Sequence, residues 1–195
     1  MADPIELTWA AAAQRFGLAQ ELQAWNEDDP VQVWEGAVTL EYLDLDGNVV
    51  VDGDLTITGD LDSQDESGFL VVLGNLTVDN VLSGGGQITV RGDLTARNGV
   101  HADYNHGYLW VKGNLTARIV LAEHAVRVDG TIAARTVDFG GFARDFAADI
   151  SRQRAVYESK DVFASELLND QGYVDGPSLA DRLRARLPIL ADGSA

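Results

Sequence analysis

A nine-residue unit occurs five times in this chain, and the repeat constrains the fold more than any other feature of the sequence. The unit reads apolar-x-apolar-x-Gly-Asp/Asn-Leu-Thr-apolar, and its glycines are 17 to 21 residues apart. The last copy keeps the glycine and the apolar positions but continues as Thr-Ile-Ala. The copies occupy residues 49–57, 70–78, 88–96, 109–117 and 126–134.

A period of about 19 residues is the length of one coil of a parallel β-helix, because three short strands and three turns fill it. We therefore predict a mainly β chain with a right-handed parallel β-helix (solenoid) of about five coils over residues 36–140. The competing interpretation is a meander of antiparallel hairpins. Hairpins would not repeat the same residues at the same corner, so we favour the solenoid.

The period-2 alternation of a strand predicts which side chains point into the solenoid. The inward set is Leu55, Ile57, Leu76, Val78, Leu94, Leu115 and Ile132. At each corner the glycine is expected to supply a left-handed or otherwise strained turn, and the Asp or Asn beside it is expected to bond the turn backbone.

Residues 1–35 and 141–195 have the apolar spacing of helices. A helix is expected to begin near Asp3, with a break at Gly17, and Gly176-Pro177 opens the last of three expected C-terminal helices. Because the open ends of a solenoid leave strands unpaired, we expect helical caps at both ends.

One outward column of the solenoid is unexpectedly apolar. Its members are Val50, Val71, Thr89, Trp110 and Arg127. Two interpretations stay open: a terminal helix covers these side chains, or they form a contact patch for a partner.

The charge of the chain is concentrated in its first half. Residues 1–90 contain 17 of the 31 acidic residues and a single base, Arg15, and so carry 16 of the 17 net negative charges. Such a polarised molecule repels nucleic acid and anionic membranes and attracts basic proteins. A solubilising surface without a partner is the alternative.

Several classes of protein are disfavoured by what the sequence lacks. The chain has no cysteine, no apolar run long enough to span a membrane, and an acidic N-terminus where a signal peptide would be basic. We expect a soluble, cytoplasmic protein.

No residue pattern indicates an enzyme, because neither a nucleophile triad nor a phosphate-cradling loop is present. His101, Asp103 and His106 lie in one loop and could bind a divalent ion together with His124, one coil away. A solvated loop is the simpler interpretation. We therefore predict no metal, no cofactor and no catalysis.

Residues 49–134 resemble the repeat of the bactofilins, polymer-forming cytoskeletal proteins whose solenoids carry Gly-Asp-Leu and Gly-Asn-Leu corners. The resemblance implies a short solenoid that polymerises through bare ends. This chain departs from that pattern, because long segments with helical spacing flank its repeats. A monomer or small closed oligomer is expected, and a bactofilin-like cytoskeletal polymer is the alternative.

The C-terminal segment from Phe163 to Leu183 resembles the ending of solenoid proteins that include immunity proteins of interbacterial toxins, among them nuclease effectors of type VI secretion. This second resemblance implies an acidic, non-catalytic immunity protein that binds a basic toxin domain. Glu41, Asp44 and Asp46 alternate with leucines, so their carboxylates should face outward. The candidate partner-binding residues are Glu41, Asp44, Asp46, Asp60, Asp62, Asp65, Glu66, Val71, Asp79 and Trp110.

Overall fold

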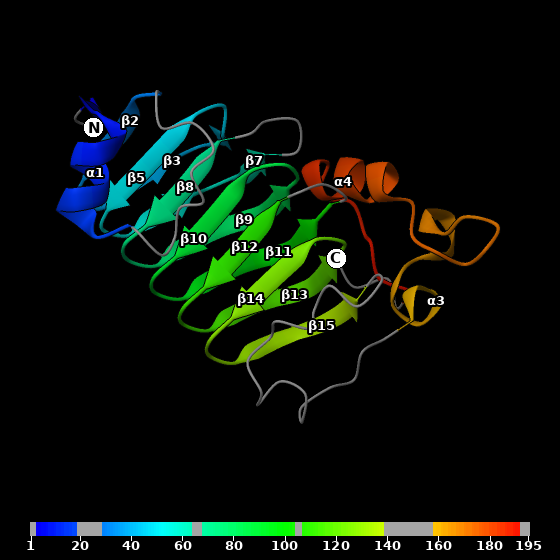
Figure 1. Cartoon of the computed structure of the whole chain (residues 1–195). Coiled ribbons are helices and arrows are strands. Elements are labelled where there is room, and N and C mark those ends of the chain that lie inside the picture. The colour runs from blue at the N-terminus through cyan, green and yellow to red at the C-terminus, as the bar shows by residue number, and fades with distance from the viewer. Residues whose placement is uncertain (1–2, 19–28, 64–67, 104–106, 139–157, 192–195) are drawn as a thin grey trace.

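The computed structural model describes residues 3–18, 29–63, 68–103, 107–138 and 158–191. They form a parallel β-solenoid of about six turns with a few short helices, so the predicted fold class is confirmed. Its strands stack one above another from the N-terminal to the C-terminal end, as Figure 1 shows.

Two sheets make up the walls of the solenoid. The first follows the order β1 (Ile5–Leu7), β2 (Val31–Glu35), β5 (Asn48–Asp52), β8 (Phe69–Val72), β10 (Gln87–Val90), β12 (Tyr108–Val111) and β14 (Ala125–Val128). All its pairings are parallel except the antiparallel pairing of β1 with β2.

The second sheet is also parallel, and it contains longer strands. Its strands are β3 (Val38–Leu40), β4 (Leu43–Asp44), β6 (Leu55–Ile57), β7 (Asp60–Ser63), β9 (Leu76–Ser83), β11 (Leu94–Ala102), β13 (Leu115–Ala122) and β15 (Ile132–Asp138). Strand β11 has a register shift between Ala96 and Gly99. In β9, β11, β13 and β15 the second and third strands expected for a coil are therefore joined into one longer strand, whereas β3 and β4, and β6 and β7, remain separate.

The solenoid has one coil more than the repeat predicts. Its first coil consists of β2, β3 and β4, and Val38 in β3 pairs in register with Leu55. The predicted boundary after residue 35 cuts this coil, because β2 was assigned to the N-terminal segment. The repeat is disguised here, since Ala37 takes the place of the corner Asp or Asn and Val38 that of leucine.

In-register stacking buries the predicted inward residues. Leu55, Leu76, Leu94 and Leu115 are directly paired from coil to coil and fully buried. Ile132, in the last coil, is only partly buried against this core. Alternation along the strand therefore identified the core face correctly.

The repeated glycines are needed for stacking more than for an unusual backbone angle. Among the five repeat glycines only Gly53 has a positive φ, at 156°. A Cβ placed on Gly92 would lie 2.7 Å from the carbonyl oxygen of Gly74 in the coil before. The expectation of a left-handed corner is thus wrong for the other four glycines, because close approach of successive corners is what excludes a side chain.

The corner Asp and Asn residues bond the next coil, not their own turn. The backbone N–H of Asn75 donates to Asp54 Oδ1 at 2.7 Å, and that of Asp93 donates to Asn75 Oδ1 at 2.9 Å. Asn114 and Thr131 continue the ladder with N–H donors at 2.7 and 3.0 Å. Each coil thereby fixes the corner of the coil that follows.

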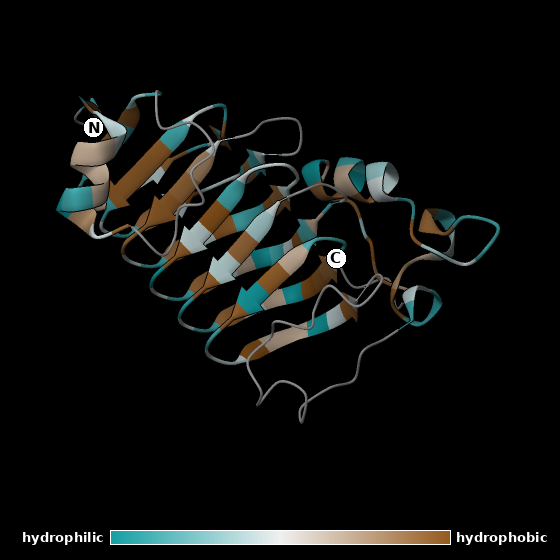
Figure 2. Cartoon of the chain, viewed as in Figure 1, coloured by the Kyte–Doolittle hydropathy of each residue, from teal (hydrophilic) through white to brown (hydrophobic). Residues whose placement is uncertain are grey.

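An N-terminal helix covers part of the apolar outward column. Helix α1 (Trp9–Phe16) starts at Thr8, whose hydroxyl accepts from the N–H of Ala11, and ends at Gly17 in the left-handed region. Its start at Thr8 corrects the expected start at Asp3. Its apolar face packs with Val31, Val33, Val50 and Val71. Figure 2 shows brown strands beside α1 and paler or teal residues on β12 and β14.

The described C-terminal residues pack along the side of the solenoid. The sequence had predicted instead that they would cap its end. They contain α3 (Ser159–Val162), the 3-10 helix η2 (Ser165–Leu167) and α4 (Gly176–Arg184). Their apolar side chains form a second cluster with Leu82, Ile119, Leu121 and Val137 on the outside of the second sheet. The expected helix from Phe142 to Ile150 lies outside the described residues.

None of the helices in the described part of the chain has the length and apolar character needed to cross a lipid bilayer.

Candidate functional site

The first coil carries the exposed part of the predicted acidic site. Glu41, Asp44 and Asp46 are exposed, whereas Leu43 and Leu45 between them are buried. None of these three carboxylates forms an ion pair with a residue that the structure describes. Tyr42, which follows Glu41 in the sequence, has 49% of its surface exposed. We call these four residues the first-coil acidic surface.

The surroundings of Tyr42 raise the pKa of its phenol. Partial burial, followed by the nearby carboxylates of Asp62 and Asp44, raises the pKa of Tyr42 to about 12. A hydrogen bond to Asp62 contributes in the same direction. The phenol therefore stays neutral and can donate a hydrogen bond at any physiological pH.

Two predicted site residues, Asp62 and Asp79, are engaged by arginines of the chain's own C-terminal segment. Arg184 donates to Asp62 Oδ2 from Nη2 at 2.7 Å and from Nε at 3.1 Å. Arg186 and Arg97 donate to the two carboxylate oxygens of Asp79, each at 2.7 Å. These contacts supply charged hydrogen-bond partners to acids that the sequence analysis had predicted to be available to a partner protein.

Asp60 is removed from the surface in a different way. It is buried at 9% exposure, and its Oδ1 accepts from Asn80 Nδ2 at 2.7 Å. Burial raises the pKa of Asp60, and the hydrogen bond from Asn80 partly opposes this effect. Asp60 and Asp62 therefore face the C-terminal segment, and the prediction that they lie exposed is wrong.

The two predicted apolar anchors are also covered. Val71 is 1% exposed beneath α1, as one of the two open interpretations anticipated. Trp110 is 8% exposed, with Lys112 Nζ 4.5 Å and Arg127 Cζ 4.3 Å from its ring centroid. Its Nε1 donates to Asp129 Oδ2 at 2.9 Å. Neither side chain is available as an anchor on this surface.

The structure therefore leaves Glu41, Asp44 and Asp46 exposed, whereas the other described candidates are buried or paired. Asp62 nevertheless stands opposite Asp44 in the pairing of β4 with β7. Asp65 and Glu66 lie outside the described residues. Sequence reasoning missed Tyr42, although an aromatic residue between exposed acids was a visible signal. It also could not distinguish an acid facing solvent from an acid facing a later segment of the chain.

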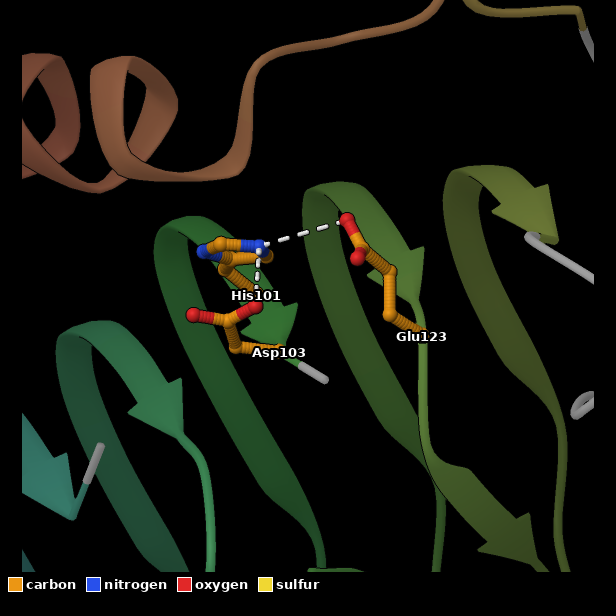
Figure 3. A group of neighbouring side chains, drawn as sticks. All are labelled: His101, Asp103 and Glu123. Atoms are coloured by element: carbon orange, nitrogen blue, oxygen red, sulfur yellow. Dashed lines mark ion pairs between the residues drawn. The ribbon is translucent and has the colours of Figure 1, made fainter. Parts of the chain in front are cut away.

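A second polar cluster lies near the end of β11. His101, Asp103 and Glu123 place one ligand atom each within 4.8 Å of one another. His101 Nε2 is 3.7 Å from Glu123 Oε1 and 4.0 Å from Asp103 Oδ1, as Figure 3 shows. The sequence had grouped His101 and Asp103 with His106, which lies outside the described residues, and had not considered Glu123.

His124 is close to this cluster but already has hydrogen-bond partners. Its Nε2 lies 2.7 Å from Ser83 Oγ, and its Nδ1 lies 3.1 Å from the carbonyl oxygen of Ala125. Burial lowers the pKa of His124. The ring is therefore a neutral structural group, because both nitrogens are used within the solenoid.

Comparison with protein-family models, with curated proteins and with solved structures found no match. The chain is therefore described by its fold, a β-solenoid of about six turns, without assignment to a family.

Proposed function

We propose that this chain is a non-catalytic binding protein for a basic protein partner, and specifically an immunity protein that neutralises a basic toxin domain. The observation that carries the proposal is the first-coil acidic surface. Its three carboxylates remain exposed and take part in no ion pair with a described residue, while other acids of the same half are used internally. A surface of this kind supports docking of a Lys- and Arg-rich partner.

A nuclease is the toxin class that fits this chemistry best. Nucleases present Lys and Arg to bind the phosphates of their substrate. Carboxylates on a rigid solenoid can occupy or flank such a cleft and exclude the nucleic acid by charge and by bulk. Long-range attraction also accelerates the encounter, which matters for a protein that must capture a toxin before it acts.

Tyr42 supplies the anchor that charge alone lacks. Charged residues at the rim of an interface contribute mainly to rate and specificity, whereas buried aromatic residues supply much of the affinity. Tyr42 is half exposed and lies near the carboxylates of Asp44 and Asp62, so a partner could bury its ring while pairing with the exposed acids of the first coil. This assigns to Tyr42 the anchoring role that the sequence had given to Trp110.

The test uses the product of the gene adjacent to that of this chain, produced separately and assayed as the candidate basic toxin domain. The wild-type chain should abolish its activity at an equimolar ratio, because a binding inhibitor acts by stoichiometry. Asp44→Lys combined with Asp46→Lys should raise the dissociation constant about tenfold or more, mainly through slower association, and weaken its salt dependence. Surface plasmon resonance at low and at physiological salt measures both effects.

A matched control reverses two acids on the C-terminal segment. Asp161 and Asp170 are exposed, so Asp161→Lys with Asp170→Lys changes the net charge equally without touching the first coil. This variant should bind nearly as tightly as wild type. Binding that ignores the first-coil reversal, or that responds equally to both reversals, would contradict the proposal. Inhibition at far below an equimolar ratio would indicate an enzyme instead.

A bactofilin-like polymer subunit is the second candidate, and one observation favours it. Within the described ranges, no strand pairs with the outer edges of β14 and β15, the last strands of the two sheets. Such edges can pair with another solenoid. Static light scattering and electron microscopy at physiological salt separate the two candidates. Filaments would support the polymer subunit, whereas a monomer or a closed oligomer would support the immunity protein.

A further inference from the structure

The cluster of His101, Asp103 and Glu123 is assembled by the solenoid itself. In the parallel pairing of β11 with β13, His101 stands opposite Leu121 and Ala102 opposite Ala122. The next step of the same register brings Asp103 beside Glu123 at the following corner. Side chains 20 or more residues apart in the sequence are thereby held together by the rigid coil spacing.

His101 is the unusual member of this cluster. Its side chain is fully buried, and neither ring nitrogen has a hydrogen-bond partner among the residues that the structure describes. Buried polar groups in proteins are nearly always hydrogen-bonded, because leaving them unpaired costs free energy. Nε2 points at both carboxylates, as Figure 3 shows, so the unpaired nitrogen is directed into the acidic pair.

A direct hydrogen bond does not explain this arrangement. The distances of 3.7 and 4.0 Å from Nε2 exceed those of protein hydrogen bonds. A single N–H also cannot serve two carboxylates equally. Two ligands of a tetrahedral metal ion, each bonded at about 2.0–2.2 Å, are separated by about 3.3–3.6 Å. The separations of 3.7 and 4.0 Å are only a few tenths of an ångström longer, so a small movement of the partly exposed carboxylates would bring all three ligands onto one ion.

We propose that His101 Nε2 and the carboxylates of Asp103 and Glu123 bind a divalent first-row transition metal ion, with Zn²⁺ as the best-fitting ion. One imidazole with two carboxylates suits Zn²⁺ better than Mg²⁺ or Ca²⁺, which prefer oxygen ligands alone. His124 is excluded as a ligand because both of its nitrogens are engaged.

The surroundings of the cluster permit an ion to enter and remain. The side chains of Asp103 and Glu123 are 29% and 19% exposed, so solvent reaches the carboxylate side. The first residue of α4 lies beside the proposed ligand atoms: a Cβ on Gly176 would be 3.6 Å from both His101 Nε2 and Asp103 Oδ1. Three protein ligands leave coordination positions for water, and the ion would cross-link two consecutive coils.

The experiment uses the full chain without an affinity tag, treated with a chelator and then titrated with Zn²⁺. Isothermal titration calorimetry should show one ion bound per chain, and the melting temperature should rise with Zn²⁺ because the ion binds the folded state. Glu123→Gln and Asp103→Asn should each raise the dissociation constant at least about tenfold, since even residues that only support metal ligands have effects of that size.

The control is Glu41→Gln, which removes an exposed carboxylate of the first coil and should leave Zn²⁺ binding unchanged. His101→Asn removes a buried ring and can fail to fold, so the two carboxylate variants, with folding checked by circular dichroism, decide the outcome. Wild-type protein that binds no Zn²⁺ overturns the proposal. So does weak binding at several sites that Glu123→Gln leaves unchanged. The result is independent of partner binding, because Zn²⁺ alone is the probe.

Discussion

The stacked corner is most sharply tested by adding one methyl group to it. In Gly92→Ala the new Cβ would lie 2.7 Å from the carbonyl oxygen of Gly74 and 2.4 Å from Asn75 Oδ1. Neither atom can retreat easily, because the Gly74 oxygen accepts from the Gly92 N–H at 2.9 Å and Asn75 Oδ1 accepts from the Asp93 N–H at 2.9 Å. The substitution must therefore separate two coils locally.

The expected magnitude follows from two opposing effects. Overpacking costs about 1–3 kcal/mol, and the reduced freedom of the unfolded chain returns about 0.4–1 kcal/mol. Gly92→Ala should thus lower the free energy of unfolding by about 1–2 kcal/mol. Gly47→Ala is the matched control, because its Cβ meets no atom within 4 Å and its φ is not positive. That variant should be neutral or slightly stabilising.

Urea denaturation followed by circular dichroism measures both variants against wild type. The comparison isolates stacking from backbone strain, since neither glycine has the positive φ that an alanine would resist. If Gly92→Ala proves as stable as Gly47→Ala, the steric account of the repeat glycines is wrong.

Two further predictions concern the core and the first coil. Leu94→Ala should cost about 2–5 kcal/mol in urea denaturation, because Leu94 is fully buried, whereas Thr95→Ala should cost under about 1 kcal/mol; equal losses would reverse the assigned faces. The Tyr42 phenol should ionise near pH 12 in the folded protein. Because this pKa is higher than in the unfolded chain, the stabilisation that neutral Tyr42 contributes should be lost as the pH rises from 10 to 12. Ultraviolet titration of wild type minus Tyr42→Phe measures this pKa, and Asp62→Asn should lower it; an unchanged pKa in that variant would contradict the role given to Asp62.

The repeat was sufficient to predict the solenoid because each copy by itself carries the residue pattern that the stacked coil requires. Alternation places every second side chain inside, and parallel stacking sets each copy on an equivalent copy. Leu55, Leu76 and Leu94 therefore meet through simple repetition. The first coil was missed in the sequence because the corner of this coil departs from the repeat. Ala37 has no side-chain oxygen, so it cannot accept a hydrogen bond as the Asp54 carboxylate does from the Asn75 N–H.

The outer surface was decided by contacts between segments far apart in the chain. Asp62 follows the pattern of a solvent-facing acid, yet it is bonded by Arg184, which is 122 residues later. Nothing in the local sequence around Asp62 distinguishes it from Asp44, which stays exposed. Glu123 likewise joins His101 only because the register of two coils brings them together.

The sequence by itself thus determined the interior of this protein, and the tertiary structure decided its exterior. The interior depends on hydrophobic burial with the strand period, which any single coil already expresses. The exterior depends on which face the terminal segments cover, and that is settled by side-chain complementarity over more than a hundred residues of separation. The sequence had named the acids of the first coil and His101 as candidates, but only the tertiary structure showed which acids stay exposed and that Glu123 joins His101.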